Sequence, residues 1–167
     1  MEPQGVARNL EMRPCPQAPY GVQKATWSVD HARAAATGLR ANVADVLQAW
    51  GLDPDGDQSF AVLLVLTELV TNAARHGRPR LGLIDVEMWL DGDRVVVTVM
   101  DGTTDVPVAR DVGSGDESGR GLRLISAYAE AGGYEPHHRG KRVWAVICPH
   151  LAVEDDSLLL DATRLAV

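Results

Sequence analysis

The segment from Phe60 to His76 constrains the fold of this chain more than any other, because its first half is apolar on almost every side. A helix with this composition is buried between a sheet and another helix. Polar residues enter only in its second half, and at about 100° per residue they share one sector of the helix: Glu68, Thr71, Asn72, Arg75 and His76. Such a stripe on an otherwise buried helix predicts a pocket or an opening beside it.

Glu68 and Asn72 lie one helical turn apart and therefore point into the same site. An amide oxygen can ligate Mg²⁺, and a carboxylate can orient or deprotonate a hydroxyl. The pair therefore suits phosphoryl transfer. A simpler interpretation is a solvated helix end, in which Glu68 only pairs with Arg75 or Asn72.

Periodicity, capping residues and turn residues predict the remaining elements. These are a helix from Asp30 to Gly51, strands at 84–91 and 94–101 joined by an Asp91-Gly92 turn, a long loop at 103–120, a helix from Gly121 ended by Gly132-Gly133, and strands at 134–138 and 142–148. This order predicts an α/β two-layer sandwich, with a mixed, mainly antiparallel sheet and helices on one face.

The 167 residues predict one domain, at 25–149. Four prolines with little periodicity mark residues 1–24 as a flexible leader, with a strand beginning near Lys24, and residues 150–167 form an acidic C-terminal tail. Asp101 follows three valines on the core-facing side of its strand, and a buried carboxylate without a partner is costly. The expected burial of the Asp101 carboxylate therefore needs an explanation.

Composition excludes several classes of function. The net charge of -7 argues against direct nucleic-acid binding. The sequence contains neither an apolar run of about 18 residues nor a signal-peptide pattern, so we expect a cytoplasmic protein without a membrane segment. Cys15 and Cys148 are expected to be free thiols, and the scattered histidines His137, His138 and His150 do not form a metal-binding pattern.

Three segments, ELVTNAARHG, DGTTDVP and SGRGLRLI, resemble in order and spacing the nucleotide-binding boxes of the GHKL, or Bergerat-fold, ATPases. Together with WGLD and GKRVWAVI they resemble most the actinobacterial anti-sigma-factor serine/threonine kinases, over roughly residues 25–149. The resemblance implies a histidine-kinase-like ATP-binding domain with ATP and Mg²⁺ as cofactors.

The resemblance also implies a role for each matching residue. Asn72 would bind the Mg²⁺ that bridges the phosphates, Glu68 would be the catalytic general base, and Asp101 would accept a hydrogen bond from the adenine amino group. The resemblance also places a further group of residues near the phosphates of the nucleotide: Arg75, His76, Gly119, Arg120, Gly121 and Leu122. Glycines ahead of a helix let backbone N–H groups approach phosphates closely.

The function implied is a regulatory protein serine/threonine kinase that phosphorylates an anti-anti-sigma (STAS-type) partner, binds a sigma factor as an anti-sigma factor, and forms a homodimer. The box after Asp101 lacks the glycines usual in the superfamily, which leaves open an ATP-binding regulator without transfer activity. Histidine kinases of the superfamily usually carry asparagine where this chain has Glu68, so a hydroxyl acceptor is favoured. Water as that acceptor would make an ATPase, but such ATPases carry a second domain for which this sequence has no room.

Overall fold

The computed structural model describes residues 10–30, 38–77, 82–105 and 120–149. The described elements, in chain order, are β1 (Glu11–Met12), β2 (Lys24–Asp30), α1 (Gly38–Ala49), α2 (Asp57–His76), β3 (Leu83–Asp91), β4 (Arg94–Asp101), α3 (Arg120–Tyr128), β5 (Ala131–His137) and β6 (Gly140–Ile147). None of these helices is long and apolar enough to cross a membrane.

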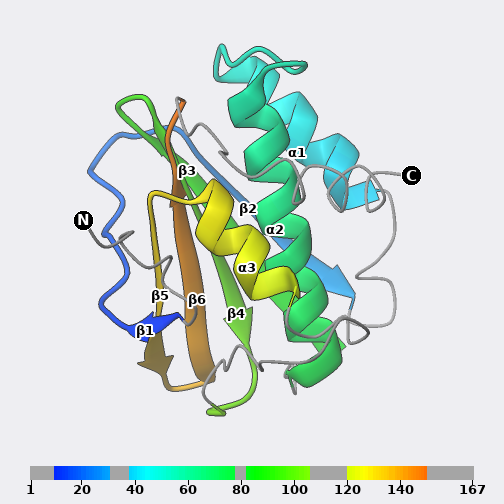
Figure 1. The fold of residues 1–167 in the computed structure, drawn as a ribbon, viewed down its shortest axis with the longest axis vertical. Coiled ribbons are helices and arrows are strands. Elements are labelled where there is room, and N and C mark those ends of the chain that lie inside the picture. The colour runs from blue at the N-terminus through cyan, green and yellow to red at the C-terminus, as the bar shows by residue number, and fades with distance from the viewer. Residues whose placement is uncertain (1–9, 31–37, 78–81, 106–119, 150–167) are drawn as a thin grey trace, which may run out of the picture.

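The strands form one sheet in the order β1-β5-β6-β4-β3-β2, and the three helices cover one of its faces (Figure 1). The short β1 pairs with β5 in parallel, whereas all other neighbours are antiparallel. The predicted two-layer α/β class and the mixed, mainly antiparallel sheet are thereby confirmed.

The main core lies between the helices and the sheet, and α2 runs through its centre. Val62 and Val65 on α2 are fully buried, and they face a row of valines on β4. That row consists of Val95, Val97 and Val99, which alternate along the strand as residues on one face must. The predicted burial of the first half of this helix is confirmed.

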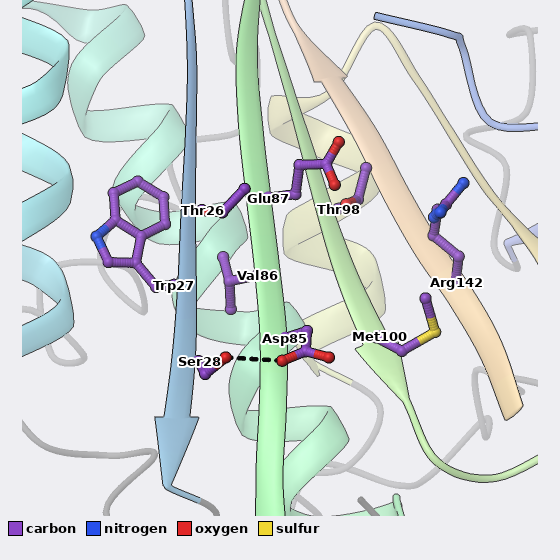
Figure 2. Close-up of a pocket in the computed structure, with 9 residues that line it drawn as sticks. All are labelled: Thr26, Trp27, Ser28, Asp85, Val86, Glu87, Thr98, Met100 and Arg142. Carbon is purple, nitrogen blue, oxygen red and sulfur yellow. Dashed lines mark hydrogen bonds between the residues drawn. The ribbon is translucent and has the colours of Figure 1, made fainter. Parts of the chain in front are cut away.

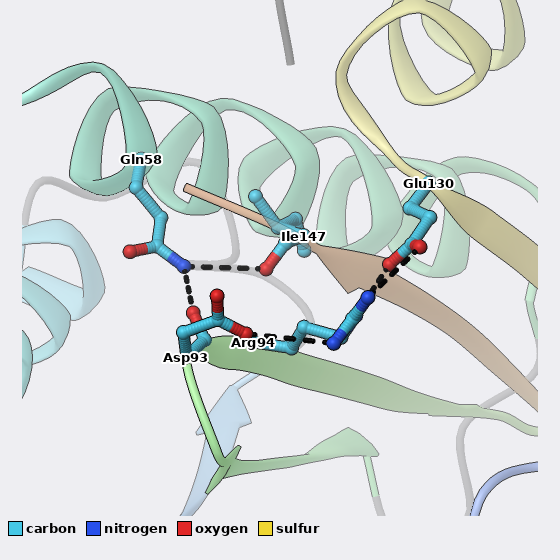
Figure 3. Close-up of polar contacts among 5 residues, drawn as sticks. All are labelled: Gln58, Asp93, Arg94, Glu130 and Ile147. Carbon is cyan, nitrogen blue, oxygen red and sulfur yellow. Dashed lines mark hydrogen bonds and ion pairs between the residues drawn. The ribbon is translucent and has the colours of Figure 1, made fainter. Parts of the chain in front are cut away.

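The N-terminal end of α2 is fastened to the end of the sheet (Figure 3). The side-chain amide of Gln58 donates to the Asp93 carbonyl at 2.7 Å and to the Ile147 carbonyl at 3.3 Å. Beside it, the Arg94 guanidinium contacts both carboxylate oxygens of Glu130, at 2.6 and 3.2 Å. These contacts fix the apolar end of the helix and leave its polar end at the opposite edge of the molecule.

The prediction that Gly132 and Gly133 end a helix is wrong. The helix α3 ends at Tyr128, and both glycines lie in β5. A Cβ atom on Gly133 would lie 2.9 Å from the Glu11 carbonyl oxygen and 3.0 Å from a ring carbon of Trp144. The glycine therefore permits β1 to approach β5. In the sequence, a glycine needed for such close packing looks the same as a glycine that ends a helix.

The described part of the expected leader packs against the sheet instead of extending freely. Cys15, Ala18 and Val22 pack on the face opposite the helices, where Cys15 is only 3% exposed. The indole N–H of Trp144 donates to the Arg13 carbonyl at 3.1 Å. Burial raises the pKa of the Cys15 thiol to about 12, so this free cysteine is unreactive at neutral pH. Residues 1–9 and the tail at 150–167 lie outside the described residues.

The first long helix also differs from its expected bounds. Asp30, predicted as its N-cap, is the last residue of β2, and the described helix α1 runs from Gly38 to Ala49. The predicted hairpin turn is confirmed, because Gly92 between β3 and β4 has a φ of 64° that glycine adopts readily. Of the long loop predicted at 103–120, residues 106–119 lie outside the described ranges.

Candidate functional site

The polar stripe of α2 lies at the end of the helix that is remote from the Gln58 anchor. Glu68 is 9% exposed and Asn72 is half-buried, whereas Arg75 and His76 near the last turn are exposed. Leu64, one turn before Glu68, is buried in the core. The stripe therefore runs from the core to the surface, and the pocket predicted beside it stays a prediction.

Glu68 is a buried acid without a hydrogen-bond partner in the described part of the chain. Burial raises the pKa of Glu68, and the positive charge of Arg75 opposes this shift only in part. A solvated helix end would have left the carboxylate in water. Glu68 is therefore not part of a solvated helix end, and a buried acid without a hydrogen-bond partner among the described residues points to a ligand or a reaction.

The raised pKa of Glu68 gives a prediction about stability. The folded state holds the Glu68 proton more tightly than the unfolded state does, so this residue lowers stability as the pH rises through and above the ordinary carboxyl range. Glu68→Gln should therefore be more stable than the wild type at pH 7, and this gain should vanish at a pH where the wild-type carboxyl is protonated. Urea unfolding of both proteins at the two pH values measures the difference; equal gains at both would contradict it.

The start of α3 lies directly against Glu68 and Asn72. A Cβ atom placed on Gly121 would lie 2.5 Å from Oε2 of Glu68 and 3.5 Å from Nδ2 of Asn72. Only glycine allows this approach. The first turn of a helix carries backbone N–H groups without helical partners and a positive dipole end, which together favour an anion. Gly121, Glu68 and Asn72 are thus brought together, as expected.

Asp101 lies at the other end of the stripe, where β4 ends, and it is 6% exposed. Its Oδ2 atom accepts from the Lys141 ammonium at 2.8 Å, and its Oδ1 atom accepts from the Thr103 backbone N–H at 3.0 Å. The sequence alone indicated no protein partner for this carboxylate. Lys141 stands opposite Asp101 in the β4–β6 register, and it was missed because the sequence did not fix that register.

Gly77, which directly follows α2, packs closely against the Asp101 side chain. A Cβ atom at this position would lie 2.6 Å from Oδ1 of Asp101 and 2.2 Å from the Ala73 carbonyl oxygen. Glu68 and Gly77 are separated by about 13 Å along the helix, at 1.5 Å per residue. The site thus has an anion-favouring end at Gly121 and, at the other end of the helix stripe, a buried ion pair at Asp101.

The close packing at Gly77 predicts a loss of stability for Gly77→Ala. The new methyl group would overlap a backbone carbonyl that cannot move freely, which costs about 1–3 kcal/mol for an overpacked site. Gly38→Ala is the matched control, because a Cβ there meets nothing within 4 Å and alanine favours a helix. Chemical denaturation measures both; equal midpoints for the two variants would show that the contact at Gly77 is not as tight as described.

The structure places only part of the predicted phosphate loop. Gly119 and the side chains of Arg120 and Leu122 lie outside what is described. Arg75 and His76 lie beyond Asn72 toward the exposed end of the helix.

Among the described residues no group of three or more His, Cys, Asp or Glu side chains could hold a metal ion. A metal at Asn72 would therefore need most of its oxygen ligands from a bound phosphate and from water, which is how Mg²⁺ is commonly held.

A separate hollow of about 310 Å³ lies on the other face of the sheet, over β2, β3, β4 and β6 (Figure 2). Asp85 and Glu87 of β3 line it, and they alternate with core residues of the same strand. The Ser28 hydroxyl donates to Asp85 across its floor at 2.9 Å. It contains none of the residues of the stripe, so it is distinct from the site described above.

The fold and this site define a two-layer α/β domain that presents a helix N-terminus to a buried acid and an amide. Residues 29–147 match the family model of the histidine kinase-like ATPase domain, and the chain therefore belongs to this family. Domains of this family bind ATP, generally with Mg²⁺, and act as ATP-dependent kinases or ATPases. No curated protein sequence matches the chain significantly.

Proposed function

We propose that this protein is an ATP-dependent serine/threonine kinase that phosphorylates a regulatory partner protein. The observation that carries the proposal is the buried Glu68 carboxylate, which lies one turn from Asn72 and against the start of α3. A histidine acceptor needs no carboxylate base. A serine or threonine hydroxyl benefits from one, because its proton has to leave as the phosphoryl group arrives.

The residues at this end of the site fit a magnesium-bound triphosphate. Asn72 offers an amide oxygen to the ion, and the first turn of α3 offers backbone N–H groups to the phosphates, with Gly121 allowing them to come close. When it is bound, the Mg²⁺ ion would neutralise part of the negative charge of the phosphates. The chain itself orients the phosphates and excludes water from Glu68.

Glu68 takes the role of general base in this proposal. Its raised pKa brings its proton affinity closer to what a base at neutral pH requires. The carboxylate would accept the proton of the attacking hydroxyl as the oxygen of the partner bonds to the terminal phosphorus, the bond from that phosphorus to the β-phosphate oxygen breaks, and ADP leaves. Arg75, whose charge acts on Glu68, would keep enough of the carboxylate ionised.

The partner is proposed from sequence resemblance. ELVTNAARHG, GRGL and GKRVWAVI resemble segments of actinobacterial anti-sigma-factor kinases, and the acceptor would then be a serine or threonine of an anti-anti-sigma (STAS-type) protein. A sigma factor would be a second partner and would link the kinase to transcription regulation. The same resemblance supports a homodimer, and the use of ATP supports action in the cytoplasm.

A second candidate is an ATP-binding regulatory module that binds its partner without transferring phosphate. The sequence after Asp101 favours it, because the glycines usual in the superfamily are missing there. This departure concerns the loop after β4 and leaves Glu68 and Asn72 unaffected.

The two candidates separate in one assay. The protein is incubated with Mg²⁺, γ-labelled ATP and STAS-type proteins encoded in the same genome, and the label is located. The kinase proposal predicts acid-stable phosphoserine or phosphothreonine on one partner. ATP binding without label transfer would support the regulatory module instead, acid-labile label would indicate a histidine acceptor, and release of free phosphate without a labelled protein would indicate an ATPase.

A further inference from the structure

We propose that Lys141 and Asp101 together read the purine base, so that adenine is selected through both its amino group and its N1 atom. The inference rests on the proposed ATP-binding function and adds a specificity-determining residue to it. It arises from the ion pair between these two residues, which is buried at the end of the site that is remote from Gly121.

Lys141 belongs to the inner face of the sheet. It follows the turn at Gly140, stands opposite Asp101 in the strand register, and its side chain is 6% exposed. Its neighbour Arg142 lies on the other face, where it pairs with Glu135 at 2.9 Å. Strand alternation therefore directs the lysine, and not the arginine, to the helix-covered side where α2 ends.

The hydrogen-bonding capacity of the pair is only partly used. An ammonium group has three N–H donors. That of Lys141 contacts Oδ2 of Asp101 at 2.8 Å and the Thr103 carbonyl at 3.4 Å, so one donor has no acceptor within the described ranges. Each oxygen of the Asp101 carboxylate has two acceptor sites, and each has one contact. The pair thus presents a spare donor beside a spare acceptor.

Leaving a buried charged donor unsatisfied costs free energy, so a spare N–H on Lys141 points to a ligand atom that accepts it. The edge of adenine has the matching pattern, because its amino group donates and the adjacent N1 accepts. Guanine carries an acceptor and a donor in the opposite order. Since Gly121 and α3 fix the phosphate end, the base enters in one orientation, and that order matters.

Comparing ATP with 1-deaza-ATP tests this inference, because the analogue replaces N1 with a C–H group and keeps the amino group. Binding of each nucleotide to the full chain is measured by calorimetry in Mg²⁺. A lost hydrogen bond to a charged donor predicts roughly 10- to 100-fold weaker binding of 1-deaza-ATP. In Lys141→Met the two nucleotides should bind within about twofold of each other, whereas Arg142→Met should keep the wild-type ratio.

The comparison on the wild type needs no variant, so it decides the matter even if Lys141→Met fails to fold. Equal binding of ATP and 1-deaza-ATP to the wild type, or an unchanged ratio in Lys141→Met, would overturn the role of Lys141 and leave the kinase proposal standing. Failure of the wild type to bind either nucleotide would overturn both.

Discussion

Asn72→Ala should abolish magnesium-dependent ATP binding and weaken the affinity measured in Mg²⁺ by about 100-fold or more. In the proposed site this amide is offered directly to the ion, and alanine has no oxygen to replace it. Asn72 is half-buried beside Gly121, so truncation also removes a polar group from the phosphate end. Calorimetric titration with ATP, in Mg²⁺ and again in a chelator, measures the effect.

Asn42→Ala is the control for this prediction, because it makes the same change at an exposed position of α1. It should bind ATP as the wild type does. Since alanine is a good helix former, neither variant should lose helical content. If Asn72→Ala retained tight, magnesium-dependent binding, the ion would be held elsewhere and the assignment of Asn72 would have to be abandoned.

Glu68→Gln should stop phosphoryl transfer while sparing ATP binding. Loss of a positioned general base typically lowers the rate by 10²- to 10⁴-fold. Glutamine keeps the shape of the side chain against Gly121 but has no carboxylate to take the hydroxyl proton. The transfer rate to the partner is measured under single-turnover conditions, and ATP affinity is measured separately, where we expect a change of about threefold or less.

The pH profile makes the same prediction more specific. Burial raises the pKa of Glu68, so wild-type transfer should fall as the pH drops through a value above the ordinary carboxyl range, and Glu68→Gln should lack this limb. Glu87→Gln is the control, because that carboxylate lies on the other face of the sheet and pairs with Lys24. Normal transfer by Glu68→Gln would rule out Glu68 as the base.

The helix α2 could be predicted from the sequence because two local signals agree. Its apolar first half predicts burial, and its polar stripe begins at Glu68, which the structure shows at the edge of the core. The hairpin between β3 and β4 was equally predictable, since alternation and the Asp91-Gly92 turn both depend on near neighbours. Local periodicity thus predicted the polar stripe of α2 and the layer in which it lies.

Features that depend on distant contacts were not predictable in the same way. Proline-rich composition indicated a free leader, but Cys15 packs with Trp144 and Val146 on the outer face, more than a hundred residues away. Gly133 resembled a helix stop, yet it lies in β5 because β1 approaches it closely. In both cases tertiary packing, rather than local propensity, decides the conformation.

The Asp101–Lys141 pair illustrates the same limit at the site itself. Alternation along β4 correctly placed Asp101 on the core face, and this burial called for a partner. The sequence does not determine the register of β6 against β4, so it did not predict that Lys141 pairs with Asp101. A charged residue directly after a hairpin turn, on the inward face of its strand, is the signal that would have found it.

The central claim is that ATP lies along the helix end of α2, from Gly121 to Asp101. An amide NMR titration of the ¹⁵N-labelled protein with ATP and Mg²⁺ tests it most directly. We expect the shifted resonances to lie in three segments, 68–77, 101–103 and 120–123, and the amides around Cys15 and Ser28 on the outer face to stay unchanged. Absence of shifts at millimolar ATP, or shifts confined to the outer face, would contradict it.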